Sequence, residues 1–209
     1  MYALTYKKKS LGRRLTTFIY KYKWITLVLL LGAYQFSSGI YIFAKAELAQ
    51  RLIARAWHKS LDFNEPVKPW PWADTYPIAE LRIKNKNWFI LAGASGRNLA
   101  FAPSHISATP KPGEQGNSVI VGHRDTQFNR LKNLQTGDII SVNTGDNTHN
   151  FKITQLRIAH ESQLEYMENH ESINGINLDE PSLTLITCYP FDSVLPNPTH
   201  RYIVRAVAI

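Results

Sequence analysis

The longest apolar stretch of the chain runs from Trp24 to Phe43 and contains no Asp, Glu, Lys, Arg or His. As a helix its twenty residues rise about 30 Å, which matches the hydrocarbon thickness of a bilayer. Tyr22 and Trp24 at one end and Tyr41 at the other stand where aromatic side chains anchor a helix at the membrane interfaces. The pattern predicts a transmembrane helix over residues 24–43.

Two different patterns follow this stretch. Residues 45–60 place Leu48, Leu52 and Ala56 at helical spacing with Lys and Arg between them, which predicts a juxtamembrane helix. Residues 65–77 contain four prolines, which exclude a regular helix or a central strand. We expect an ordered connector there, with its two tryptophans packed on the wall of the domain that follows; the less favoured alternative is that Trp70, Trp72 and Asp74 cover a groove.

From Ile78 to the C-terminus the pattern is strand-like and is interrupted by Gly, Pro and Asn turns. The segments predicted as strands are 79–83, 88–92, 118–122, 138–142, 150–159, 182–188 and 202–208. Short strands with few helices are typical of a β-barrel or a β-sandwich. Residues 161–181 have no clear period, and a short helix or an irregular connection is expected there.

Charge adds an orientation to this picture. The chain has 24 Lys and Arg against 16 Asp and Glu, and seven of the basic residues but none of the acidic ones lie in residues 1–23. Residues 44–209 are therefore nearly neutral, which argues against nucleic-acid binding. The positive-inside rule places residues 1–23 in the cytoplasm and the rest of the chain outside it. A cleaved signal peptide, with Ala44 and Ala46 at the cleavage site, is the alternative.

The single cysteine, Cys188, ends a predicted strand and precedes Tyr189 and Pro190. One cysteine excludes an intrachain disulfide and multi-cysteine metal sites. His123 ends another apolar strand, and Arg201 begins the last one. A thiol, an imidazole and a guanidinium at strand ends can supply a nucleophile, a proton shuttle and a cation for an oxyanion. Taken alone, however, a lone cysteine is more often a small buried side chain.

Three separated motifs resemble those of the sortase family. TLITCYP followed by THRYIVRA is similar to the sortase TLxTC box and its Arg-containing last strand, and PGEQGNSVIVGHRDTQF is similar to the sortase His motif. The order also fits, with the cysteine 65 residues after the histidine and the arginine near the C-terminus. The phrases KPWPWADTYP and LAFAPSH further resemble the Gram-negative sortases, called class GN or the marine proteobacterial type.

This resemblance implies a mainly β fold, an eight-stranded sortase-like β-barrel with its catalytic groove at strand ends. Cys188 would be the nucleophile and His123 the general acid and base. Arg201, rather than Arg205, would hold the oxyanion and the substrate backbone. Thr187, which matches the threonine before the family's cysteine, is a candidate substrate-binding residue, and a β-branched strand residue without such a role is the equal alternative.

The implied organisation is a basic cytoplasmic segment at 1–23, a transmembrane helix at 24–43, a helix and connector at 44–74 and a catalytic barrel at 75–209. The implied reaction is cleavage of an LPxTG-like C-terminal sorting signal between Thr and Gly, through a cysteine thioester, and transfer to a primary amine. The partners would be a sorting-signal protein at the membrane and an amine acceptor, without nucleic acid. No cofactor or metal ligand is predicted, and activation by a metal ion is left open. The Gram-negative type implies the inner membrane, with the barrel in the periplasm.

Three alternative functions fit this sequence less well. An L,D-transpeptidase also uses an envelope cysteine and a histidine, but its cysteine follows a glycine in an SHGC-type phrase that this chain lacks. A zinc hydrolase is disfavoured because no HExxH motif is present. A membrane-tethered β-barrel that binds an envelope protein through an inactive sortase-like site remains the non-enzymatic alternative.

Asp125 is expected either to orient a neighbouring side chain or to lie in solvent.

Overall fold

A computed structural model describes residues 21–163, 180–193 and 198–209, and it divides the chain into two compact units, 1–48 and 49–209. The first element described is one continuous helix, α2 (Lys23–Phe63). It joins the predicted apolar span to the predicted juxtamembrane helix because residues 44–47 are good helix formers and the first proline is Pro66. Asn64 follows the helix with a φ of 52°, a left-handed conformation that asparagine adopts at helix C-termini.

The apolar part of α2 is a candidate membrane anchor by length and composition. Its mean hydropathy over 18 residues is 1.6, and none of that window is buried in the protein. Large side chains such as Leu29, Leu31 and Phe43 are more than half exposed, whereas a helix from the core of a globular domain would bury one face.

The last turns of α2 pack within the second unit. Ile53 is fully buried against Leu91 and Ala102, and Gln50 donates a hydrogen bond to the Phe101 carbonyl at 2.7 Å. The connector that follows behaves as expected at Trp70, whose ring lies edge-on to Phe101 with centroids 5.1 Å apart. The expectation is wrong for the second tryptophan of the connector. Trp72 is 82% exposed, because the chain turns at residues 70–72 and directs this side chain away from the barrel.

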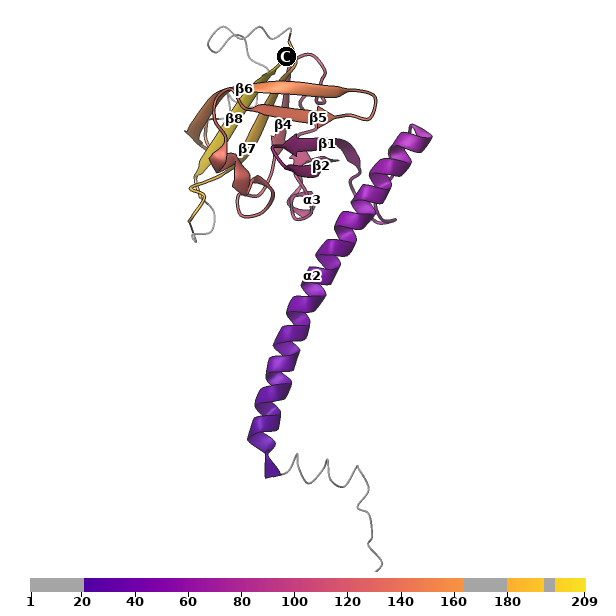
Figure 1. The fold of residues 1–209 in the computed structure, drawn as a ribbon, viewed down its shortest axis with the longest axis vertical. Helices are drawn as coiled ribbons and strands as arrows, with labels where there is room; N and C mark the ends of the chain where they lie inside the picture. The colour runs from indigo at the N-terminus through magenta and orange to yellow at the C-terminus, as the bar shows by residue number, and fades with distance from the viewer. Residues whose placement is uncertain (1–20, 164–179, 194–197) are drawn as a thin grey trace, which may run out of the picture. The chain divides into compact units, whose positions relative to one another are not determined.

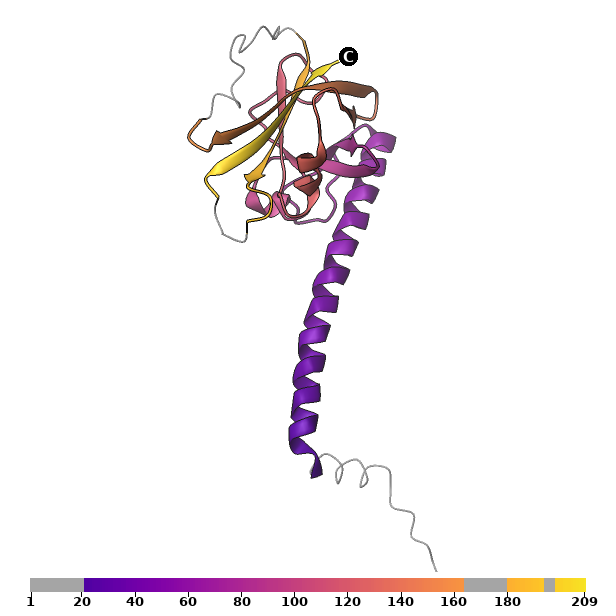
Figure 2. The same cartoon turned by 60° about the vertical axis from the view of Figure 1, so that its left-hand side comes forward.

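The second unit is a closed eight-stranded barrel in the order β1-β2-β3-β4-β7-β8-β6-β5. Figures 1 and 2 show the strands of this unit from two directions. Neighbouring strands are antiparallel except for two parallel pairs, β2 with β3 and β4 with β7. The strands are β1 (Pro77–Ile83), β2 (Lys86–Ala92), β3 (Ser104–His105), β4 (Asn117–Val121), β5 (Ile139–Asn143), β6 (Thr148–His160), β7 (Ser182–Tyr189) and β8 (His200–Ala208). Two short helices, α3 (Gly96–Leu99) and the 3₁₀ helix η1 (Gln127–Asn133), complete the unit.

Alternate residues of each strand point into and out of the barrel, and this alternation places the Cys188 side chain on the outer face. Leu183 and Leu185 of β7 belong to the interior cluster, which also contains Phe128 and Phe151. Ile186 of the same strand belongs to a smaller outer cluster with Ile203 and others. Residues 184, 186 and 188 of β7 therefore lie on the outer face.

All seven predicted strands are present with ends shifted by at most two residues, and the mainly β barrel is confirmed. The strand that the pattern did not predict, β3, has two residues and so carries no period to recognise. For the expected irregular connection at 161–181, residues 164–179 lie outside the described residues.

Candidate active site

Cys188 and Arg201 face each other across the β7–β8 pair. The register joins Cys188 directly to Arg201, Ile186 to Ile203 and Thr187 to Tyr202. Directly opposed residues in an antiparallel pair point to the same face with Cβ atoms about 4.5–5.5 Å apart. Cys188 is partly exposed and has no disulfide partner. The predicted thiol and guanidinium are thus brought together on the outer face, near the end of β7.

His123 follows the strand on the other side of β7. The parallel register pairs Val121 of β4 with Ile186 and ends two residues before His123 on one strand and two residues before Cys188 on the other. Beyond the last paired residues, the Gly122 amide donates to the Ile186 carbonyl at 3.1 Å. The His123 side chain is exposed, which leaves its ring nitrogens accessible to a substrate. The structure therefore places all three predicted catalytic residues at one end of three adjacent strands.

Gly122 lets the Phe128 ring approach the backbone immediately before His123. A Cβ atom at this position would lie 2.8 Å from a ring carbon of Phe128, which is fully buried in η1. The Phe128 amide in turn donates to the His123 carbonyl at 3.0 Å. The 3₁₀ helix is therefore packed on the backbone that carries the histidine, and it holds that backbone in place.

The structure places Thr187 between the two strand ends. Its side chain is 2% exposed, and its hydroxyl donates to the Gly122 carbonyl at 2.7 Å. This hydrogen bond links the residue before Cys188 to the residue before His123. A role for Thr187 in binding substrate stays a prediction.

Arg124 supports the site although the sequence motifs did not single it out. Its side chain is buried, and its guanidinium donates to the carbonyls of Pro190 at 2.8 Å and Ser193 at 2.7 Å. Nε donates to Asp125 at 3.2 Å, so Asp125 does contact a neighbour while remaining 69% exposed. The sequence shows only that a basic residue directly follows His123. The fold shows that the side chain of this residue reaches the loop after Cys188.

Two aromatic side chains of the segment after Cys188 pack against a third on β8. Phe191 lies edge-on to Tyr202 with centroids 5.1 Å apart, and Tyr189 stacks on Tyr202 at 6.3 Å. Burial raises the pKa of the Tyr202 hydroxyl, and the nearby Tyr189 raises it further, so Tyr202 stays neutral at ordinary pH. Tyr189 and Phe191, which follow Cys188, therefore pack against an uncharged side chain of β8.

Arg201 is held by its own loop and by an acid. One terminal nitrogen donates to the Pro198 carbonyl and to the His200 carbonyl, and the other donates to Glu161 at 2.8 Å. These bonds use three of the five N–H groups of a guanidinium. Among the described residues no acceptor contacts Nε or the second Nη2 hydrogen, and the side chain is 25% exposed.

The described residues were compared with the side-chain groupings that hold metal ions. Within residues 21–163, 180–193 and 198–209, no three His, Cys, Asp or Glu side chains are grouped so that they could hold a metal ion.

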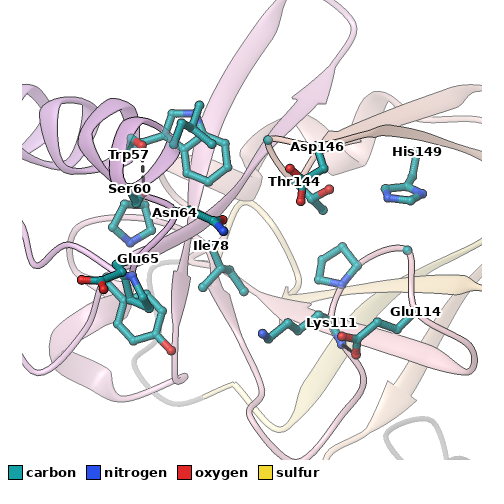
Figure 3. Close-up of a pocket in the computed structure, with 17 residues that line it drawn as sticks. Trp57, Ser60, Asn64, Glu65, Ile78, Lys111, Glu114, Thr144, Asp146 and His149 are labelled. Atoms are coloured by element: carbon teal, nitrogen blue, oxygen red, sulfur yellow. Dashed lines mark hydrogen bonds between the residues drawn. The ribbon is translucent and has the colours of Figure 1, made fainter.

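A pocket of about 500 Å³ lies at the other end of the barrel and is separate from this site. Figure 3 shows it between the last turns of α2, with Trp57 and Ser60, the loop that carries Lys111, and the β5–β6 hairpin with Asp146 and His149. The hairpin starts β6, whereas the end of β6 pairs with His200 beside the site. The pocket therefore does not contribute to the chemistry of Cys188.

Comparison with known proteins decides the family. A family model described as the sortase domain matches residues 81–209, more than half of the chain. The chain belongs to the sortase family. Sortases are cysteine transpeptidases, which act on a sorting signal and an amine acceptor.

Individual relatives agree with this assignment. Sortase D of Bacillus subtilis (strain 168) is 29% identical over 127 residues, which is 61% of this chain and 60% of that protein. The structure of a Sortase D5 transpeptidase from Clostridium perfringens has a TM-score of 0.60 at 23% identity, over 78% of this chain and 99% of that one. Sortase A from Corynebacterium diphtheriae has a TM-score of 0.56 at 21% identity, over 66% of this chain and 63% of that one. At these identities the solved structures show a shared fold.

Proposed function

We propose that this sortase is a membrane-anchored cysteine transpeptidase that cleaves an LPxTG-like C-terminal sorting signal between Thr and Gly. The observation that carries the proposal is the alignment of three strand ends. Cys188 is directly opposite Arg201, and His123 follows the parallel strand on the other side of Cys188. A nucleophile, a general acid and base, and a cation are thereby available to one carbonyl group.

The reaction has two halves. In the first, the Cys188 thiolate attacks the Thr carbonyl carbon, and the oxyanion that forms accepts hydrogen bonds from the free N–H groups of Arg201. The C–N bond then breaks, and His123 gives a proton to the departing glycine amine. In the second, a primary amine attacks the thioester, His123 takes its proton, and the Cys188 thiolate leaves. The products are a new amide bond and the regenerated thiolate.

The surroundings of Arg201 and His123 suit this sequence of steps. Glu161 and the two loop carbonyls orient the guanidinium without using all its donors, so it can bind an oxyanion while it keeps these contacts. Exposure of His123 lets the imidazole reach both the leaving amine and the incoming one.

The cellular location and membrane topology of the enzyme are part of the same proposal. Residues 24–43 would span the inner membrane, residues 1–23 would lie in the cytoplasm, and the barrel would lie in the periplasm. We assign the chain to the Gram-negative subtype, class GN, on the phrases around Trp70 and Ala102. An enzyme at this address meets translocated proteins that are still held at the membrane by their C-terminal tails.

Amine-dependent transfer tests the proposed function. Full-length protein in detergent micelles is incubated with an LPETG-containing peptide, with and without hydroxylamine, and products are separated by chromatography. We expect a Thr hydroxamate that requires hydroxylamine, and loss of at least 1,000-fold in rate for Cys188→Ala and His123→Ala. Arg201→Lys keeps the charge but not the fork of donors and should lose about 10- to 100-fold. A folded wild-type protein that binds the peptide without cleaving it would contradict the proposal and favour a binding module.

A further inference from the structure

We propose that Trp72 inserts its indole into the polar interface of the bilayer and so holds the catalytic barrel against the membrane surface. The inference rests on the proposed function, because it takes residues 24–43 as the membrane anchor. It adds a second membrane contact, which the second unit makes itself. The partner is the lipid surface on the side of the bilayer where the barrel lies.

Trp72 is the most exposed tryptophan of the second unit. Its exposed fraction is 82%, whereas Trp57 is 4% exposed. The other two are partly buried, with Trp70 packed on Phe101 and Trp88 packed on the interior cluster. An indole combines a large apolar ring with one N–H donor, and tryptophan is enriched at membrane interfaces for that reason. Trp72 therefore presents to its surroundings the kind of side chain that a bilayer interface binds.

The turn that carries Trp72 is fixed by the residues around it. The Ala73 amide donates to the Trp70 carbonyl at 3.0 Å, and Ala73 is only 4% exposed. Thr75 is 2% exposed, and its hydroxyl donates to the Ala92 carbonyl of β2 at 2.7 Å. Buried neighbours thus hold the exposed indole in a defined place on the barrel.

The connector runs back along the last turns of α2, toward the end of the second unit that continues into the anchor. Pro66 lines the larger pocket beside Asn64, which directly follows the helix (Figure 3). Pro69 lines a cleft of about 250 Å³ together with Leu52, which lies three turns earlier in the helix. Trp72 follows three residues after Pro69, so its turn lies beyond this cleft along the connector.

Chain connectivity limits how far this turn can lie from the bilayer. Gln50 follows Phe43 by seven residues, which span at most about 25 Å in any arrangement of the chain. The Gln50 side chain donates to the Phe101 carbonyl at 2.7 Å, and the Phe101 ring contacts Trp70. Trp72 comes two residues later. The anchor therefore keeps this part of the second unit close to the membrane surface.

Basic side chains near the turn favour the same partner. Lys68 shares the smaller cleft with Arg55 and Lys59 of α2, and no acidic residue is among the described residues that line it. Arg97 of α3 lies 3.8 Å from Asp74, and its side chain is 79% exposed despite this ion pair. An exposed aromatic ring with cations around it is typical of surfaces that bind anionic lipids.

Quenching of tryptophan fluorescence by lipid tests the inference. Full-length protein is reconstituted in vesicles of phosphatidylglycerol with phosphatidylcholine, the latter brominated on its acyl chains or not. The difference in emission between the wild type and Trp72→Phe isolates this indole, so the emission of Trp24 cancels. We expect the brominated lipid to lower this difference signal at least about twofold. The matched control is Trp88→Phe, on a partly buried residue of β2, whose difference signal should not change.

A Trp72 signal that aqueous iodide quenches and brominated lipid leaves unchanged would overturn the inference. Protection of that signal from iodide by an LPETG-containing peptide would overturn it as well, and would assign Trp72 to a cover over the substrate groove. The difference between the wild type and Trp24→Phe reports separately on the anchor. Lipid quenching of Trp24 without quenching of Trp72 would leave the proposed function standing, whereas quenching of neither would contradict the membrane anchor and, with it, this inference.

Discussion

Arg124 joins the segment that follows the proposed base to the loop that follows the proposed nucleophile. It directly follows His123, and its buried guanidinium donates to two carbonyls in the loop after Cys188. Two parallel donors of one planar group fix both distance and direction, which a lysine cannot do. The spacing between imidazole and thiol therefore depends on a residue that need not touch the substrate.

We expect Arg124→Met to lower kcat/KM by at least about tenfold and to destabilise the fold by about 1–3 kcal/mol, because two carbonyls lose their charged donor. Arg124→Lys should recover part of the stability but less of the activity. Peptide cleavage and thermal unfolding are measured together, with exposed Arg130→Met as the control. Unchanged cleavage by Arg124→Met would contradict the positioning role.

The candidate residues could be predicted from the sequence to different extents. Cys188, His123 and Arg201 stand inside recognisable motifs, and the structure places them together. Arg124 could not be assigned a role in this way, because its role depends on a loop 66 residues away in the chain. Such contacts come from topology and not from local pattern.

At the scale of elements, the parallel pair β4–β7 determines where the site forms. Both strands end toward the same edge of the barrel, so the residues after Val121 and Ile186 meet there. The 3₁₀ helix η1 then packs Phe128 onto Gly122, at a distance that excludes any larger residue. The other seven strands were predictable from alternation, whereas β3 was not, since two residues show no period. The sequence pattern did not predict η1 either.

Gly122→Ala tests this packing. The added methyl group would lie 2.8 Å from the Phe128 ring, so η1 or the backbone of His123 must move. We expect a loss of about 1–3 kcal/mol in the free energy of unfolding, together with a fall in cleavage rate. Phe128→Leu should recover part of the loss in the double variant, as a double-mutant cycle would reveal. Gly96→Ala, where no atom lies within 4 Å of the new methyl group, is the matched control and should be nearly neutral.

At the scale of the whole molecule, the chain consists of two compact units, 1–48 and 49–209, each with its own proposed task. The first contains the candidate anchor, and the second contains the barrel with the aligned strand ends. The single cysteine suits the proposed periplasmic location of the barrel. No second thiol is available to form an intramolecular disulfide with Cys188 in that oxidising compartment.

The central claim is that Cys188 forms a thioester with a sorting signal, and intact-mass spectrometry tests it most directly. Full-length protein in detergent micelles is incubated with an LPETG-containing peptide, beside Cys188→Ala. The account predicts an added mass equal to the peptide cut after Thr, absent from the variant and released by hydroxylamine. A folded protein whose Cys188 reacts freely with an alkylating reagent but acquires no peptide mass from LPETG or from altered motifs would contradict it.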